Sequence, residues 1–540
     1  MKKTLSIAIL LSGFLAACGG GGGGGSTPPP VNPPVTGLAP PAFSNLAGTT
    51  PADAALGQPL DVQWTLPAGV ALQSVTLDAE LTAGPQSSPA TCEATAGTLA
   101  PDATAATITL PNTCGSKTVK QVVLRLAIQA TDGRRSSATR TFNAPGDPAG
   151  FVPRRVSLPV LRITTQNLAP IVSRDVYLPA QLYLESNVAG EAPVNSSLEI
   201  RGRGNSTWDL MPKKPYRLKL TAKLPLLGMP SSRDWVLLAN YSDKSLMRNA
   251  LAMELGASLG MPWAPRSRFV ELYLNDRYDG VYQLMENIKI AKDRVDIDEL
   301  GEDDDDADVV TGGYLLEVDF RQDGHTIFSA TENLPIVFKD PEEPSPAQES
   351  YLKGYIDEFE SVLYSGDFAD PVNGYARYID VDSFIRWFIV NEVFRNRDAN
   401  MWSSCWMYKP RGGKLHMGPL WDFDIAAGNI DYDAAWGMTG WWIRDAPWFS
   451  RLFEDPAFVA RVREMWNEAR GDQLTAMLAS IRTRASEMQQ SQLNNFQRWP
   501  ILEMYVWPNY RIPGSYGGEI DYVESWLTTR IAWMDDQFNP

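Results

Sequence analysis

The segment RNRDANMWSSCWMYKPRGGKLHMGPLWDFD, residues 395–424, decides the fold that we expect for the larger part of the chain. It follows an apolar run over residues 384–394, which predicts a buried helix. Within the segment, residues 405–409 and 414–417 flank a Pro-Arg-Gly-Gly turn, a pattern that predicts a short β-hairpin. A helix that leads through a loop into a hairpin predicts a domain of mixed α and β structure.

Carboxylates lie on both sides of this hairpin: Asp398 precedes it, and Asp422 and Asp424 follow it. Because a hairpin brings its two ends together, we expect these side chains to lie close to one another. Protein kinases use the same order of helix, loop carboxylate, hairpin and second carboxylate to place a catalytic Asp and a metal-binding Asp beside a phosphate. Mg²⁺ commonly takes one or two protein carboxylates together with substrate phosphates, and an Asp-x-Asp pair can supply them.

Two other interpretations of the same acids stay open at this point. A pair of carboxylates also suits a glycosidase, with one as the acid and one as the nucleophile or base. They can equally be structural, with Asp398 ending a helix and Asp422 and Asp424 capping a turn, because an Asp-x-Asp pattern alone is a weak signal.

The composition narrows the classes of function. The chain has 540 residues, with 48 Lys and Arg against 64 Asp and Glu, and its charge of −16 argues against broad binding to nucleic acid or anionic membranes. Its only histidines, His325 and His416, leave little room for a Ser-His-Asp triad or a three-histidine zinc site. Four cysteines without a CxxC pair argue against a zinc ribbon or an iron–sulfur cluster. Any chemistry would therefore depend on carboxylates, Lys, Arg and aromatic side chains.

The start of the chain predicts export and a lipid anchor. Residues 1–18 combine two lysines with an apolar run that is too short to cross a bilayer. They end in Leu-Ala-Ala-Cys18, which resembles the lipobox of bacterial lipoproteins; an ordinary secretory signal is the alternative. The Gly- and Pro-rich residues 19–41 predict a linker. We expect a lipoprotein that faces the periplasm or the cell exterior and is attached to the membrane through its lipid alone.

Residues 42–150 predict a small Ig-like β-sandwich. Short runs alternate apolar and polar residues between turns, at 60–64, 75–81, 106–110 and 122–128. Cys92 and Cys114 lie in this part and are expected to form a disulfide outside the cytoplasm. No convergent charged or aromatic residues stand out, so we interpret this part as a spacer or binding module.

Residues 151–540 predict a larger α+β unit whose C-terminal part is helical. The expected elements are a helix over 245–259 capped by Asp243, a hairpin of strands 269–274 and 281–286 with its turn at 275–280, and late helices over 458–470 and 520–538. An acidic run at 302–306 lacks EF-hand spacing and predicts a solvated loop rather than a calcium site.

Seven motifs occur in a fixed order through this unit. They are RGRGNSTW (201–208), PKKPYRLK (212–219), WVLLANYSDKS (235–245), Arg248-Asn249, YDGVYQLMEN (278–287), GGYLLE (312–317) and WDFD (421–424). Together they resemble the CotH family of bacterial spore-coat and surface proteins over about residues 155–450. The resemblance implies an atypical protein-kinase-like fold and transfer of phosphate from ATP to Ser or Thr of a protein, with Mg²⁺ or Mn²⁺. It implies that Asp398 is the catalytic-loop Asp and that Asp422, assisted by Asp424, binds the metal.

Charge suggests further roles. Transfer of a phosphoryl group requires cations, and Lys214 (or Lys213), at the start of an alternating strand, is the candidate lysine, with a surface lysine as the alternative. Glu286 could orient that lysine, or be a rim carboxylate. Arg203 and Arg201 flank glycines that would let the backbone approach a phosphate, unless these glycines serve only a tight bend.

One feature of the kinase pattern is altered. The Asn that often holds a second metal five residues after the catalytic Asp is replaced by Ser403, while Asn400 lies two residues after it; either side chain, or neither, is a ligand. Tryptophans at 402, 406, 421, 436, 441 and 442 could stack on adenine or a sugar, although core packing is the default.

The leading hypothesis is therefore a surface-tethered kinase that phosphorylates an exported protein. The alternative is a non-catalytic surface lipoprotein on the same fold, a pseudokinase that binds a protein or polysaccharide. ATP is scarce outside the cytoplasm, which favours the alternative, whereas the three intact carboxylates favour the enzyme.

Overall fold

The computed structural model describes residues 38–46, 56–83, 90–115, 117–143, 158–188, 191–301 and 303–540. The signal sequence, Cys18 and most of the linker lie outside these ranges and remain predictions. In the described ranges, no helix combines the length and the apolar character needed to cross a membrane.

The N-terminal part is all β. β1 (Ala42–Phe43), β2 (Pro59–Thr65) and β5 (Ala105–Thr109) form one sheet. The other sheet contains β3 (Leu72–Ala83), β4 (Ala90–Leu99), β6 (Thr113–Cys114), β7 (Lys117–Ala130) and β8 (Arg135–Asn143). Alternate residues of β2 and β3 are buried, and this alternation is the apolar–polar sequence pattern that predicts strands. Cys92 and Cys114 form a disulfide with Cα atoms 5.6 Å apart.

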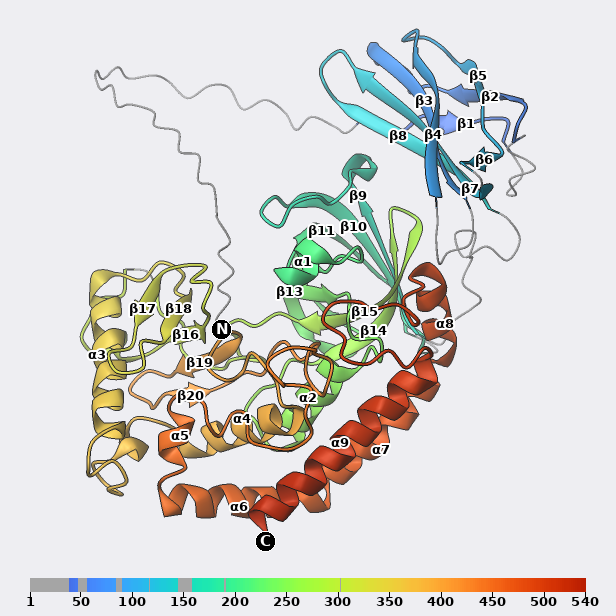
Figure 1. The fold of residues 1–540 in the computed structure, drawn as a ribbon. Coiled ribbons are helices and arrows are strands. Elements are labelled where there is room, and N and C mark those ends of the chain that lie inside the picture. Colours follow the sequence, from blue (N-terminus) through green and yellow to red (C-terminus); the bar gives the residue numbers. More distant parts are fainter. Residues whose placement is uncertain are drawn as a thin grey trace, which may run out of the picture. The chain divides into compact units, whose positions relative to one another are not determined.

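A closed seven-stranded barrel follows (Figure 1). Around the barrel the order is β10 (Leu178–Glu185), β11 (Val194–Gly202), β12 (Tyr216–Leu226), β13 (Met229–Leu238), β15 (Arg277–Glu286), β14 (Ser267–Leu274) and β9 (Val160–Thr165). Neighbouring strands are antiparallel except β9 and β14, which are parallel and complete the closure. Along β11, Leu198 and Ile200 point into the buried interior, whereas Glu199 and Arg201 lie on the outer face.

The predicted hairpin in this barrel forms, but its turn is shorter than expected. Asn275 and Asp276 make the turn with φ of 52° and 61°, and β15 begins at the next residue. Asn and Asp tolerate positive φ, so they serve the turn without glycine. Gly280 lies within β15 instead, where an added Cβ would be 2.6 Å from Oδ1 of Asn495. Glycine is needed there because a helix packs closely against the strand.

A second sheet has the order β17 (Thr326–Phe328), β18 (Pro335–Asp340), β16 (Tyr314–Val318), β19 (Cys405–Lys409) and β20 (His416–Met417). β19 and β20 are the predicted hairpin after residue 395, and Tyr408 pairs with His416. The apolar helix before them is α4 (Val381–Phe394), which is buried on nearly every side. α3 (Pro346–Leu363) packs beside this sheet. The acidic residues 303–306 lie in an exposed loop.

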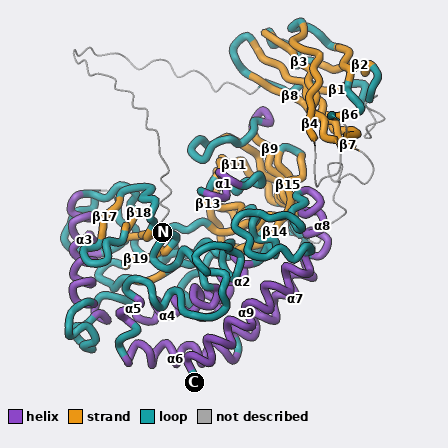
Figure 2. The backbone as a smooth tube through the Cα atoms, in the orientation of Figure 1, coloured by secondary structure: helices purple, strands orange, loops and turns teal. Residues whose placement is uncertain are grey.

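Further helices pack on α4, on one another or, in the case of α8, on β15 of the barrel (Figure 2). They are α2 (Arg248–Ser258), α5 (Phe449–Leu452), α6 (Pro456–Gly471), α7 (Gln473–Glu487), α8 (Gln489–Arg498) and α9 (Tyr516–Phe538). The late helices confirm the predicted ones. α2 begins three residues later than expected, and Asp243 is not its N-cap residue; its Oδ2 atom nevertheless accepts a hydrogen bond from the amide of Arg248 at 2.9 Å. The chain is thus a protein of mixed α and β structure, as the sequence predicts.

Candidate functional site

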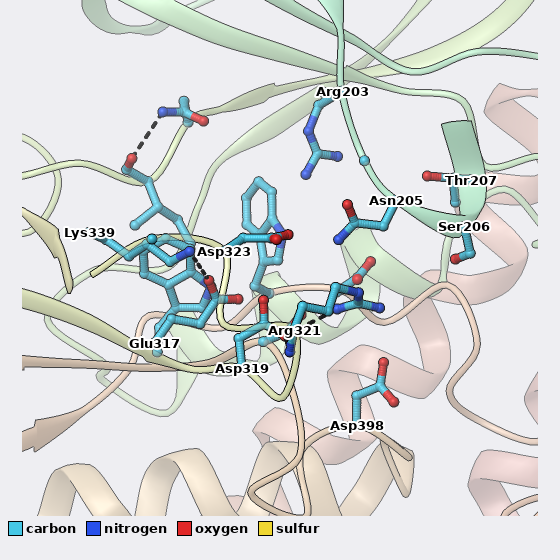
Figure 3. A pocket seen from close by; sticks show the side chains of 18 of the residues that line it. Arg203, Asn205, Ser206, Thr207, Glu317, Asp319, Arg321, Asp323, Lys339 and Asp398 are labelled. Atoms are coloured by element: carbon cyan, nitrogen blue, oxygen red, sulfur yellow. Dashed lines mark hydrogen bonds and ion pairs between the residues drawn. The ribbon is translucent and has the colours of Figure 1, made fainter. Parts of the chain in front are cut away.

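A cleft of about 990 Å³ lies between the outer face of the barrel and the second sheet with its following loops. The barrel side contributes Arg203 and the short helix α1 (Ser206–Leu210). The opposite side contributes Asp398 and the end of β16 (Figure 3). Segments from residues 174 to 508 therefore contribute to one cavity.

Asp398 stands in a tight loop directly after α4. Arg395 ends the helix in the left-handed conformation, with φ of 44°, and redirects the chain. The carbonyl of Asp398 accepts hydrogen bonds from the amides of Trp402 and Ser403, each at 3.1 Å. Its carboxylate pairs with Arg397, Oδ1 to Nη1 at 3.0 Å. The loop thus holds the carboxylate in a defined position at the cleft.

Asp422 and Asp424 enter the same cleft because Phe423 anchors the chain between them. Phe423 is fully buried, and its amide donates to Oδ1 of Asn249 at 2.8 Å. Asp422 has φ of 62° and its side chain is open to the cleft, whereas Asp424 lies beneath it with 9% exposure. The alternating Asp-Phe-Asp pattern therefore places one residue in the core and two in the cavity.

The three carboxylates are close enough to disfavour one another's charge. Burial and the neighbouring Asp422 raise the pKa of Asp398. Although Asp422 opens to the cleft, desolvation by the protein around it raises its pKa, against the opposing effect of Arg203 and Arg321. The pKa of Asp424 is raised well above its ordinary value by burial and by Asp422. A divalent cation would relieve this repulsion.

These acids do not amount to a complete metal cage. Among the residues that the structure describes, no group of three or more His, Cys, Asp or Glu side chains is arranged to hold a metal ion. The chemistry of the donors fits Mg²⁺ or Mn²⁺ bound by Asp422 and Asp424, with water and substrate oxygens completing its shell.

Further charged residues of the cleft, for which the sequence predicts no role, come from β16 and the loop after it. Glu317 pairs with Lys339 at 2.9 Å, and burial raises its pKa to about 7. Asp319 pairs with Arg321 at 3.2 Å and accepts a hydrogen bond from the hydroxyl of Ser403 at 3.0 Å. The available signal was a Glu and an Asp in a run whose other residues are apolar, because a buried strand carries carboxylates only where they have partners.

Arg203 lies where the sequence predicts a phosphate-binding cation. Its guanidinium group is 5.2 Å from the ring of Trp421, and it contributes to the electrostatics of Asp422 and Asp424. Burial lowers its pKa. The glycines beside it serve the bend: a Cβ on Gly202 would be 2.3 Å from the Trp208 ring, and one on Gly204 would be 2.4 Å from the Thr207 hydroxyl.

The predicted lysine and its glutamate partner do not belong to the cleft. Lys214 donates to the carbonyl of Trp208, and Lys213 is buried beneath α8, where it donates to the carbonyls of Ala239 and Val281 at 2.8 and 2.5 Å. Neither lysine lines the cavity. Glu286 does not line the cavity either.

Glu286 holds the neighbouring strand of the barrel. Both of its carboxylate oxygens accept hydrogen bonds from the side chain of Arg266 at 2.9 Å, and Nε1 of Trp263 donates to it at 3.2 Å. The only lysines in the cavity wall, within the described residues, are Lys289 and Lys339.

The second-metal candidates also differ from expectation. Asn400 does not line the cleft, and its Oδ1 atom is buried without a hydrogen-bond partner. Ser403 is buried and bonds to Asp319 and Arg321. Among the tryptophans, those at 402, 406 and 421 line the cavity, and those at 441 and 442 pack against the core. Trp436 stacks on Tyr510.

Crowded carboxylates facing guanidinium groups across a cleft are the arrangement expected where a divalent cation and a phosphate-like anion bind side by side. A family model described as "CotH kinase protein" matches residues 200–534, which is more than half of the chain. The chain therefore belongs to the CotH family. No curated protein matches the chain in sequence.

Proposed function

We propose that this protein is a CotH-type protein kinase that transfers the γ-phosphoryl group of ATP to a Ser or Thr hydroxyl of an exported protein, with Mg²⁺ or Mn²⁺. The observation that carries the proposal is the convergence of Asp398, Asp422 and Asp424 on one cleft that also contains Arg203 and Arg321. A purely adhesive surface would have no use for three carboxylates that raise one another's pKa. A glycosidase would leave the facing arginines without a role.

Different residues of the cleft have different roles in the proposed phosphoryl transfer. The hydroxyl oxygen of the acceptor bonds to the γ-phosphorus, the bond from that phosphorus to the bridging oxygen of ADP breaks, and ADP leaves with that electron pair. Asp398 accepts the hydroxyl proton, a task that suits a carboxylate whose pKa burial has raised. A metal ion held by Asp422 and Asp424 would neutralise phosphate charge.

Cations of the cleft would stabilise the transferred group. Arg203 and Arg321 act on Asp422 and would contact the phosphate beside it. Lys339, held by Glu317, takes the role of the lysine–glutamate pair of protein kinases. The succession of α4, the Asp398 loop, the β19–β20 hairpin and the Asp-Phe-Asp segment is the basis for proposing a kinase-like fold.

The location of this activity follows from the sequence. We propose that Cys18 carries the lipid anchor and that the β-sheet part around residues 42–143 is a spacer. The acceptor protein would then lie in the periplasm or at the cell surface, and ATP must be supplied there.

Phosphorylation in vitro tests the proposal. The purified full chain is incubated with ATP labelled at the γ-phosphate and with Mg²⁺ or Mn²⁺, and label on the protein is measured. We expect metal-dependent incorporation that Asp398→Asn abolishes and the exposed control Asp367→Asn leaves unchanged. No incorporation with either metal, together with no stabilisation by nucleotide, would instead support the non-catalytic surface protein.

A further inference from the structure

We infer that Arg201 and Arg217 form the binding site for the α- and β-phosphates of the nucleotide, and so fix its direction in the cleft. This inference rests on the proposed kinase function for the identity of the ligand. The site itself, a polyphosphate-binding row of arginines on the outer face of the barrel, can be tested independently of catalysis.

The register of the barrel brings the two arginines together. Arg201 of β11 and Arg217 of β12 are directly opposite each other in the antiparallel pairing. Two residues away on the same face, Glu199 lies opposite Lys219. Opposite charges in such positions stabilise a sheet, and like charges destabilise it. The oppositely charged pair, Glu199 and Lys219, lies outside the cleft, whereas the like-charged pair, Arg201 and Arg217, lines it.

No protein anion compensates the two arginines. In the described part of the chain, neither Arg201 nor Arg217 has a carboxylate within ion-pair distance, and both Nε atoms are buried without an acceptor. By contrast, Arg174 on the same wall donates to the carbonyl of Gly204 at 2.8 Å and to Oδ1 of Asn205 at 2.7 Å. Buried donors without partners are costly, so a ligand with many acceptor oxygens suits this position.

The order of charges along the wall sets the direction of the ligand. Arg203 follows Arg201 by two residues, and its amide donates to the carbonyl of Pro215, two residues before Arg217, at 3.1 Å. Its guanidinium group lies 5.2 Å from the ring of Trp421, the residue directly before Asp422. Arg203 thus stands between the carboxylates and the Arg201–Arg217 pair. A chain of phosphates that begins at Asp422 would pass Arg203 and reach this pair, so the γ-phosphate lies at the carboxylates and the earlier phosphates lie at the pair.

Binding of tripolyphosphate, ATP and AMP to the full chain tests this inference. The double variant Arg201→Gln/Arg217→Gln is compared with the control Arg233→Gln, which removes an exposed arginine of β13 outside the cleft. We expect the double variant to weaken tripolyphosphate and ATP binding about tenfold or more. AMP binding should fall less, and Arg233→Gln should behave as the original chain.

The ligand-free protein offers a second readout. Removing one of two opposed like charges should leave the unfolding temperature of Arg217→Gln unchanged or higher. Arg201→Lys/Arg217→Lys, which keeps both charges, should retain more tripolyphosphate affinity than the glutamine variant. Tripolyphosphate binding that is absent from the original chain, or equal in the original and the glutamine variant, would overturn the inference.

Measurements of phosphoryl transfer and of tripolyphosphate binding together test the kinase proposal and the arginine site separately. Asp398→Asn should abolish phosphoryl transfer while tripolyphosphate still binds. If the original chain transfers no phosphate but its tripolyphosphate affinity still depends on Arg201 and Arg217, the kinase proposal fails and the arginine site stands.

Discussion

Two carboxylates of this protein, Glu392 in the helical core and Asp424 in the cleft, are both shielded from bulk water but differ in their partners. Glu392 pairs with the fully buried Arg530 of α9 and accepts hydrogen bonds from the amides of Trp442, Ile443 and Arg444. Asp424 has no ion-pair partner in the described ranges, and its strongest charged neighbours are other acids.

Glu392 stabilises the fold through partners within the protein. The charged groups of the cleft lack such partners and are candidates to bind a ligand. In the core, each lone pair of Glu392 is used, and the pair joins α4 to α9 and to the loop between them. In the cleft, carboxylates face one another and arginines face one another. Uncompensated charge of this kind destabilises the folded protein. It is retained where the loss of stability is small, or where binding of a ligand offsets that loss.

The largest expected effect concerns the core pair. Glu392→Ala removes the ion-pair partner of Arg530, which keeps its hydrogen bonds to main-chain carbonyls, and the acceptor of three amides. Breaking a buried pair in this way costs about 3–5 kcal/mol. Urea unfolding of the full chain, followed by tryptophan fluorescence, measures the loss. The exposed Glu468→Ala is a suitable control on α6. An unchanged midpoint would contradict the view that this pair holds the fold.

Asp422→Asn should behave in the opposite way. It removes a metal ligand, so we expect metal-dependent phosphorylation to fall about 10²-fold or more, because a metal ion contributes several kcal/mol. It also removes repulsion, so the ligand-free protein should unfold at the same or a higher temperature. The pKa of Asp398 should move down towards its ordinary value. A variant that loses both activity and stability would show that Asp422 is structural.

Two lysine variants are expected to have smaller effects, and they compare a lysine of the cleft with a lysine outside it. Lys339→Met removes a cation from the cleft and leaves Glu317 unpaired, and we expect about a tenfold rise in the KM for ATP. Lys214→Met removes a lysine that bonds only to the Trp208 carbonyl and stacks over the Trp208 ring, so the KM should stay as it is. The reverse result would restore the lysine that the sequence predicted.

The smallest effect is a pH dependence. The folded state raises the pKa of Asp398, Asp422 and Asp424 above the values of the unfolded chain, so it binds protons more strongly than the unfolded chain does. Stability of the ligand-free protein from this source is therefore greatest at low pH and falls as pH rises through the raised values. Glu317, whose pKa is about 7, extends this loss towards neutrality.

A bound cation should reverse that trend, because it binds the ionised carboxylates. The rise in unfolding temperature caused by Mn²⁺ should be larger at about pH 8 than at about pH 5. Asp367→Asn, in an exposed loop, should keep this difference, and Asp422→Asn should reduce it. A Mn²⁺ effect that is independent of pH would place the ion elsewhere.

The sequence predicted most of the elements because local patterns encode them. The apolar run gave α4, and alternation around Pro-Arg-Gly-Gly gave the β19–β20 hairpin, which in turn brings Asp398 and Asp422 together. The CotH resemblance was confirmed by the family match over residues 200–534.

Lys214 and Glu286, which the structure places outside the cleft, make contacts that only the barrel creates. Both residues carry the charge that their predicted role requires. The pairing of β15 with β13 and β14 places Glu286 against Arg266, and the chain before β12 places Lys214 against the carbonyl of Trp208. Glu317, Asp319 and Arg321 were missed because β16 reaches the cleft only through its pairing with β18 and β19. No spacing along the chain expresses these contacts.

The closure of the barrel by β9 has a practical consequence. The family match begins at residue 200, inside β11, yet β9 and β10 lie before it and occupy the gap between β14 and β11. A recombinant fragment that starts at the match would expose two unpaired strand edges and part of an apolar interior, and we expect it to be recovered as aggregate. A fragment for expression should therefore keep β9 together with Leu158, which packs on the core, and Pro159, whose carbonyl accepts a hydrogen bond from the amide of Glu271 at 2.9 Å.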